Sequence, residues 1–228
     1  MIKNIFLDLD DTIFDFKIAE GKALTKTLEQ LGIEPKEEIV NRYSVINDSQ
    51  WKLLELGKLT RDEVKVRRYQ LLFEEIGSDA SAQEASDIYA GYLAQGHYFV
   101  DGAEEMLEKL HHRFRLYLVS NGTSVVQHGR LESSDIEKYF EEIFISEEIG
   151  YNKPSKEFFT HCFSQISDFK KEESVIIGDS LSSDIQGGIN AGITTIWFNL
   201  RNHPEREDIV PDYTIHHLSE VCPLVGLK

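Results

Sequence analysis

The hydrophobic pattern of the chain begins with a short apolar run that stops at acidic residues. Residues 5–9 read Ile-Phe-Leu-Asp-Leu, and two more acids and a threonine follow. Such a run is typical of a buried parallel strand that ends at a loop, and it predicts a strand over residues 2–9. Further short apolar runs predict strands over residues 116–119, 143–145, 174–177, 194–198 and 212–215.

The spacing of the apolar residues changes after the first predicted strand. Over residues 17–99 they recur every three or four positions, with interruptions at glycines such as Gly57 and Gly77. This period is that of helices that bury one face, and glycine commonly ends a helix. The tetrapeptides 60–63 and 81–84 have the spacing of a capping box, which begins a helix. The segment therefore predicts several helices and no strand.

Helical and strand patterns alternate from residue 100 to the end of the chain. This alternation predicts a parallel sheet with helices on both faces, which the first strand must join. The expected fold class is therefore α/β, with a doubly wound, mostly parallel sheet of the Rossmann-like kind. Residues 1–15 and 100–228 would form this core, and residues 16–99 an inserted all-helical domain.

Composition narrows the possible functions. The chain has 24 basic and 40 acidic residues and a formal net charge of −16, which argues against nucleic acid and anionic membranes as partners. Its two cysteines form no disulfide framework, and no apolar run reaches the roughly 18 residues of a membrane span. The first residues do not resemble a signal peptide, so we expect a cytoplasmic location. A monomer and a homodimer are equally compatible with this composition.

Polar clusters follow four of the predicted strands. They are Asp8 with Asp10 and Thr12, Ser120 with Asn121, Lys153, and Asp179 with Asp184. In a doubly wound sheet the carboxyl ends of the strands share one edge, so these clusters are expected to converge there. Paired carboxylates repel each other unless a cation neutralises them, and oxygen ligands favour Mg²⁺. Taken alone, an Asp-x-Asp pair is more often a solvated acidic turn than a metal site.

These motifs, in this order, resemble those of the haloacid dehalogenase-like hydrolase superfamily. The matching residues are Asp8-x-Asp10-x-Thr12 and Ser120 after apolar strands, Lys153 before Pro154, and Gly178-Asp179 followed by Asp184. The resemblance covers the whole chain, because members of the family carry a cap where the helical insertion lies. Residues 7–16, the helical cap, and the sequences Ser120-Asn121-Gly122 and Gly178-Asp179-Ser180 further resemble the pyrimidine 5′-nucleotidase branch. One departure is Asp11, which stands where many members have glycine.

The resemblance implies a role for each matching residue. Asp8 would be the nucleophile that forms an aspartyl-phosphate, and Asp10 the general acid and base. Mg²⁺, or Mn²⁺ as a substitute, would be bound by Asp8, by the backbone carbonyl of Asp10, and by Asp179 and Asp184. Ser120, Asn121 and Thr12 would hold the phosphoryl oxygens, and Lys153 would offset negative charge. An acid at the position of Asp10 argues against carbon–halogen chemistry.

The expected function is therefore a Mg²⁺-dependent phosphatase of nucleoside 5′-monophosphates with pyrimidine bases, modified ones included. The alternatives are a phosphatase of another small ester, such as phosphoglycolate or a sugar phosphate, and a sugar-phosphate mutase. A binding module without catalysis would require the loss of a core acid, and none is missing. The partner expected in each catalytic case is a small phosphorylated substrate.

Some residues favour a structural interpretation over a functional one. Phe14, Phe16, Tyr43 and Trp51 could form an apolar shelf for a base, but packing between helices is the favoured explanation for each of them. The adjacent pair Arg67-Arg68 is expected to be exposed on a helix. The pair His111-His112 is expected to point apart and to lack the spacing of a zinc site.

Overall fold

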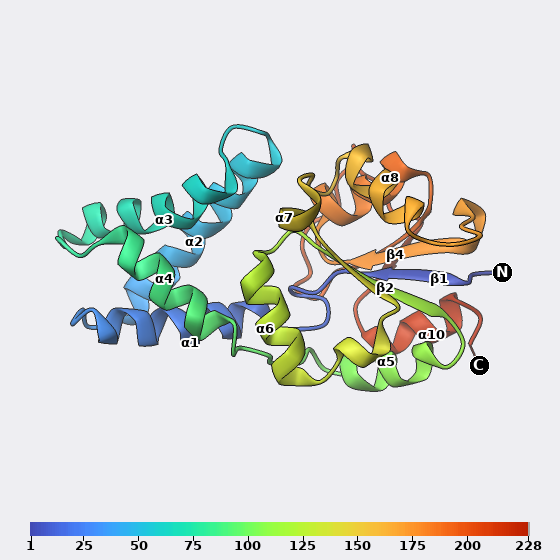
Figure 1. Ribbon diagram of the computed structural model, residues 1–228, viewed down its shortest axis with the longest axis horizontal. Helices are drawn as coiled ribbons and strands as arrows, with labels where there is room; N and C mark the ends of the chain where they lie inside the picture. Colours follow the sequence, from blue (N-terminus) through green and yellow to red (C-terminus); the bar gives the residue numbers. More distant parts are fainter. Residues whose placement is uncertain (228) are drawn as a thin grey trace.

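The computed structural model describes residues 1–227, and within them six parallel strands form one sheet in the order β3-β2-β1-β4-β5-β6 (Figure 1). The strands are β1 (Asn4–Leu7), β2 (Arg115–Ser120), β3 (Glu142–Ile145), β4 (Ser174–Gly178), β5 (Thr194–Phe198) and β6 (Tyr213–Ile215). β1 lies between β2 and β4, where Ile5 pairs with Leu116 on one side and Val175 on the other. The predicted fold class and the parallel sheet are confirmed, although β1 is shorter than the expected 2–9.

Helices cover both faces of the sheet, which explains why the strand sequences are almost continuously apolar. Side chains alternate between the faces, so Ile5 and Leu7 enter one apolar cluster and Phe6 enters another. The first cluster includes residues of α5 (Ala103–His111) and α10 (Val221–Leu224). The second includes residues of α8 (Lys156–Ser164) and α9 (Gln186–Ala191), on the opposite side of the sheet.

The inserted segment forms four helices that stand beside the sheet, and we call these four helices the cap (Figure 1). They are α1 (Phe16–Gln30), α2 (Glu37–Glu55), α3 (Arg61–Ile76) and α4 (Ala82–Leu93). An apolar cluster formed mainly by the cap includes the fully buried Leu24, Tyr43 and Leu72, and Val126 of the core joins it. The predicted capping box of Thr60 and Glu63 is present at the start of α3. The cap helices therefore pack chiefly against one another.

Two adjacent linkers join the cap to the core. The chain leaves the core after Asp15 and returns through residues 94–99, and the Asp15 amide donates to the Tyr98 carbonyl at 2.7 Å. The Val100 amide donates to the Ile13 carbonyl at 2.9 Å, and Phe14 and Phe99 form an antiparallel bridge. Any movement of the cap relative to the core must therefore bend these two linkers, which are hydrogen-bonded to each other.

Two predicted helices differ from the observed ones. The helix expected over 123–140 ends earlier, as α6 (Ser124–Ser134), because Asp135 adopts the left-handed conformation with φ +57°. The helix expected over 184–191 begins with a wider π-type turn at Leu181–Ile185 before α9. The Ser180 side chain accepts a hydrogen bond from the Ser183 amide at the start of this turn.

Two interpretations of adjacent basic residues were wrong. Arg67 is exposed, but Arg68 is buried in the cap. The rings of His111 and His112 do not point apart, because His112 lies just beyond the last turn of α5, and the ring centroids are 3.7 Å apart. Together with Glu108 they form an exposed group whose ligand atoms lie within 4.8 Å of one another. No helix in residues 1–227 is long and apolar enough to span a membrane.

Candidate active site

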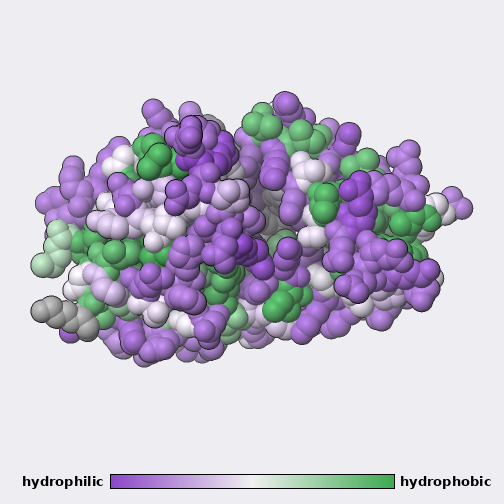
Figure 2. All heavy atoms as spheres, turned by 180° about the vertical axis from the view of Figure 1, so that it is seen from behind, coloured by the Kyte–Doolittle hydropathy of each residue, from purple (hydrophilic) through white to green (hydrophobic). Residues whose placement is uncertain are grey.

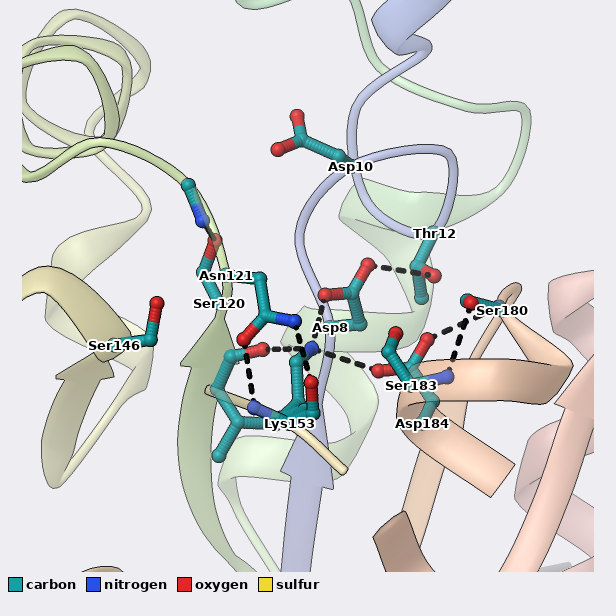
Figure 3. Close-up of polar contacts among 12 residues, drawn as sticks. Asp8, Asp10, Thr12, Ser120, Asn121, Ser146, Lys153, Ser180, Ser183 and Asp184 are labelled. Carbon is teal, nitrogen blue, oxygen red and sulfur yellow. Dashed lines mark hydrogen bonds and ion pairs between the residues drawn. The ribbon is translucent and has the colours of Figure 1, made fainter. Parts of the chain in front are cut away.

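The predicted site residues meet at the carboxyl edge of the sheet (Figure 3). Asp8 directly follows β1, Ser120 is the last residue of β2, and Asp179 directly follows β4. Lys153 and Asp184 come from the segments after β3 and β4; the Lys153 side chain points to Asp8, and Asp184 accepts from the same ammonium. The parallel sheet thus brings together residues that lie more than 100 positions apart in the chain, as expected for a doubly wound fold.

Lys153 is the centre of this group. Its ammonium donates to Asp8 Oδ1 at 2.6 Å, to Asp184 Oδ1 at 2.7 Å and to the Val119 carbonyl at 2.7 Å. The side chain is 1% exposed, so all three ammonium protons have protein partners. Burial alone would lower the pKa of Lys153, but the attraction of Asp184 and Asp8 outweighs it and raises the pKa. The ammonium therefore stays charged.

Three carboxylates surround this single cation. The carboxylate oxygens of Asp8, Asp179 and Asp184 lie within 4.8 Å of one another. Burial raises the pKa of Asp8 to about 7, with Lys153 opposing the shift and Asp184 and Asp10 adding to it. Burial and the neighbouring Asp8 also raise the pKa of Asp179 well above its usual value. These acids therefore resist ionisation unless further positive charge is present, and their hard oxygen donors fit a divalent cation such as Mg²⁺.

The residues expected to hold phosphoryl oxygens occupy different positions. Asn121 bridges the backbone of Lys153, accepting from its amide at 2.8 Å and donating to its carbonyl at 2.9 Å. The hydroxyl of Ser120 accepts from the Gly122 amide at 3.0 Å and borders the cavity described below. The Thr12 hydroxyl, in contrast, is buried beside Asp8 Oδ2 at 3.4 Å and does not border that cavity.

Asp10 points away from Asp8 (Figure 3). Two residues of α6 hold its carboxylate: Gln127 Nε2 donates to Oδ2 at 2.7 Å, and the Arg130 guanidinium forms an ion pair with Oδ1. The sequence analysis missed both residues. Their only signal was that they lie three positions apart in the helix after Ser120, and so share one helical face.

Asp11 has the conformation that a glycine would adopt without strain. Its φ is +56°, and its carboxylate accepts from the Phe16 amide at 3.0 Å and from Arg201 at 2.8 Å. These bonds stabilise the left-handed backbone of a residue that carries a side chain. The departure from the family pattern is thus accommodated within the turn, next to the first linker.

A cavity of about 680 Å³ lies between the core and the cap. The space-filling view shows the molecule hollowed between its two parts (Figure 2). Asp8, Asp10, Ser120 and Lys153 border the cavity on the core side. The cap contributes aromatic, apolar and polar walls, including Phe16, Asn47, Trp51, Arg68, Ser86, Tyr89 and Leu93. The space is large enough for a nucleotide-sized ligand.

The four aromatic residues considered for an apolar shelf divide into two groups. Phe16 and Trp51 border the cavity. Phe14 is buried in the core, and Tyr43 is buried in the cap, where its hydroxyl bonds to that of Tyr69 at 2.8 Å. Packing thus explains Phe14 and Tyr43, whereas Phe16 and Trp51 are available to a ligand.

Polar contacts fasten the cap onto the core beside the cavity. Arg61 at the start of α3 donates to the Asn121 carbonyl at 3.1 Å and to Asn152 Oδ1 at 2.7 Å. Lys65 forms an ion pair with Glu147 at 2.7 Å. These contacts connect the cap to the same loops that carry Asn121 and Lys153. These contacts could not be predicted from the sequence, because they depend on how the cap docks.

Comparison with known proteins gives a consistent result. The family model described as haloacid dehalogenase-like hydrolase matches residues 5–198. The chain is 38% identical to YfnB of Bacillus subtilis, named as a HAD-hydrolase, over 99% of this chain and 96% of that protein. A crystal structure of YfnB bound to magnesium matches with a TM-score of 0.95 and covers 99% of both chains.

Two further relatives carry the name of an activity. The chain is 37% identical to the pyrimidine 5′-nucleotidase PynA of Streptococcus pneumoniae, over 96% of this chain and 93% of that protein. It is 28% identical to the pyrimidine 5′-nucleotidase YjjG of Escherichia coli, over 97% and 96% of the two chains.

Proposed function

The chain belongs to the haloacid dehalogenase-like hydrolase family and is a phosphoric monoester hydrolase, and we propose that its substrates are pyrimidine nucleoside 5′-monophosphates. The observation that supports this proposal best is the cavity between core and cap. One end holds Asp8 and Lys153, and the other end has aromatic and polar walls from the cap. A nucleotide has the matching two parts, a phosphate and a planar base.

Asp8 would act as the nucleophile. Lys153 bonds to Oδ1 of Asp8, which leaves Oδ2, with its long contact to Thr12, as the oxygen free to attack phosphorus. A bond forms between this oxygen and phosphorus, the bond from phosphorus to the nucleoside oxygen breaks, and Asp10 gives its proton to that oxygen. The product is an aspartyl-phosphate on Asp8 and a free nucleoside.

Water completes the reaction in a second step. Asp10, now deprotonated, takes a proton from a water molecule that attacks phosphorus, and the bond to Asp8 breaks to release inorganic phosphate. Asp8, Asp179 and Asp184, with the backbone carbonyl of Asp10, would hold Mg²⁺, for which Mn²⁺ could substitute. When bound, the metal supplies positive charge that offsets repulsion between Asp8 and the phosphate. Ser120 and the Asn121 amide would bind phosphoryl oxygens.

The nucleoside would lie in the part of the cavity formed by the cap. Phe16 and Trp51 offer aromatic surfaces for the base. Arg68 also borders this part, and its hydrogen bonds go to neutral oxygens, Asn47 Oδ1 at 2.9 Å and the Lys65 carbonyl at 3.3 Å. A buried guanidinium with neutral partners is a suitable donor for the carbonyl oxygens of a pyrimidine.

A phosphate-release assay with Mg²⁺ tests the proposal. The panel holds pyrimidine and purine nucleoside 5′-monophosphates, phosphoglycolate and hexose phosphates, and is run with the unmodified protein, Asp8→Asn and the exposed control Asp79→Asn. We expect the highest kcat/KM for the pyrimidine nucleotides, loss of turnover in Asp8→Asn and no change in the control. Preference for phosphoglycolate or a sugar phosphate would keep the chemistry and refute the nucleotide assignment. A mutase would interconvert sugar phosphates and release little phosphate.

A further inference from the structure

Arg130 has an unusual position for a charged side chain. It is fully buried, and Asp10 is the one carboxylate with which it forms an ion pair in residues 1–227. Its guanidinium carbon lies 5.0 Å from the centre of the Phe14 ring. A buried cation requires a well-placed anion, because an unpaired one would be strongly destabilising. The ion pair holds Asp10 while it is ionised; when Asp10 carries the proton on Oδ2, Arg130 Nη1 still donates to the carbonyl oxygen Oδ1, so the side chain keeps its place in both states.

The remaining bonds of Arg130 fix its orientation. Nε donates to the Gly96 carbonyl at 2.7 Å, and Nη1 also contacts Gln127 Oε1 at 3.1 Å. Gln127 in turn donates from Nε2 to Asp10 Oδ2 at 2.7 Å and to the Ser120 hydroxyl at 2.8 Å. Both carboxylate oxygens of Asp10 therefore have a donor from α6. The Asp10 side chain is nevertheless 30% exposed and borders the cavity.

The connection to Gly96 places this group beside the linker that returns from the cap. α6 packs closely against that linker, since a Cβ on Gly129 would lie 2.9 Å from both the Cβ and the carbonyl oxygen of Ala94. A glycine is required at this contact. Arg130 is therefore held by the rigid helix, by the linker carbonyl and by Asp10 at the same time.

We propose that Arg130 and Gln127 are positioning residues that fix the Asp10 carboxylate at the cavity wall, where it meets the leaving oxygen of the substrate. The inference rests on the proposed phosphatase mechanism, in which Asp10 transfers the proton. Asp10 directly precedes a turn and has a short, rotatable side chain, so without these two donors it would sample several orientations. Proton transfer requires hydrogen-bond distance to the reacting oxygen, so a loosely held donor is a poor one.

The test compares leaving groups. An alkyl phosphate expels a poor leaving group that needs the proton, whereas 4-nitrophenyl phosphate expels a stable phenolate that hardly needs it. The assay measures kcat/KM, which reports on steps up to the aspartyl-phosphate, for 4-nitrophenyl phosphate and for the best alkyl phosphate of the panel. The variants are Gln127→Leu, Arg130→Lys and Arg130→Met, with the exposed Gln165→Leu as the matched control.

We expect Gln127→Leu to lower kcat/KM for the alkyl phosphate about tenfold and for 4-nitrophenyl phosphate less than threefold, since a general acid contributes roughly 10²–10⁴ when fully effective. Arg130→Lys, which keeps the charge, should retain more of the alkyl phosphate activity than Arg130→Met. If Arg130→Met does not fold, Gln127→Leu and Arg130→Lys still decide the matter. Equal losses on both substrates, as expected if Gln127 only supports Ser120, would overturn the proposal, and so would unchanged rates.

Failure of the proposed function is visible separately. It would appear in the unmodified protein, as a panel result in which the best alkyl phosphate is not a nucleotide. The ratio between alkyl and aryl substrates would still test Arg130 and Gln127 in that case. The inference concerns the proton donor and does not depend on which alcohol leaves.

Discussion

Replacing Lys153 with methionine removes the one cation that contacts Asp8 and Asp184 within residues 1–227, while keeping a side chain of similar length. Both carboxylates lie within 2.7 Å of the ammonium, and Lys153 and Asp184 are each 1% exposed. Taking away one partner of a buried ion pair leaves the other charge uncompensated and typically costs about 3–5 kcal/mol. We expect a loss of this size at pH 8 without metal.

The loss should depend on pH, because protonation can relieve it. The pKa of Asp8 is about 7 with Lys153 present, so at pH 5.5 its carboxyl is largely neutral and repels Asp184 less. The Lys153→Met protein should therefore lose clearly less stability at pH 5.5 than at pH 8. Added Mg²⁺ should restore part of the loss at pH 8, since its charge replaces that of the ammonium.

Urea unfolding followed by far-UV circular dichroism measures this difference. With a slope of about 2 kcal/mol per molar urea, a loss of 4 kcal/mol lowers the midpoint by about 2 M. Lys156→Met is the matched control, because Lys156 is exposed and three residues away, and its midpoint should barely change. A loss below about 1 kcal/mol at pH 8, or an equal loss at both pH values, would refute the view that the ammonium neutralises these acids.

Three further predictions concern the metal site and the cap. The raised pKa values of Asp8 and Asp179 mean that these two groups lower the stability of the metal-free protein as pH rises from about 4 to 7. The increase in Tm on adding Mg²⁺ should therefore be larger at pH 8 than at pH 6. Equal increases at the two pH values would contradict this. Gly178→Ala should weaken Mg²⁺ binding at least tenfold by calorimetry, because the new Cβ would lie 2.3 Å from Asp184 Cγ; unchanged affinity would show that the carboxylate can move aside. Arg68→Met should raise KM for nucleotides about tenfold, a loss of roughly 1.4 kcal/mol, and leave 4-nitrophenyl phosphate unaffected, whereas the exposed Arg67→Met should change neither.

The group of polar residues at the carboxyl edge of the sheet could be predicted from the sequence, because the rule that places them there depends only on the order of residues along the chain. Each strand is a short apolar run, each polar cluster follows a run, and parallel strands place all of these ends together. The convergence of Asp8, Lys153 and Asp184 follows directly from that rule. Their individual chemical roles stay a prediction, drawn from the family resemblance.

The parts that were missed depend on how helices face one another. Arg68 looks like an exposed residue beside Arg67, and only the docking of three cap helices around it makes it a buried one. Arg130 likewise gains its role from the rotation of α6 toward Asp10, 120 positions earlier in the chain. Local spacing shows which residues share a helical face but does not show what that face contacts.

The central place of β1 sets an order in which the protein can fold. β1 is synthesised before the strands on both of its edges: Asn4 pairs with Arg115 on one side and with Ser174 on the other, where its side chain bonds to a serine 170 residues away. The cap helices, whose contacts are mostly local, can pack against one another during synthesis, before the partner strands of β1 have been made. Closing such a long loop is slow, and the exposed strand can pair with other chains meanwhile. Asp8 therefore reaches its place beside Lys153 and Asp184 in one of the last steps of folding, when β4 docks beside β1.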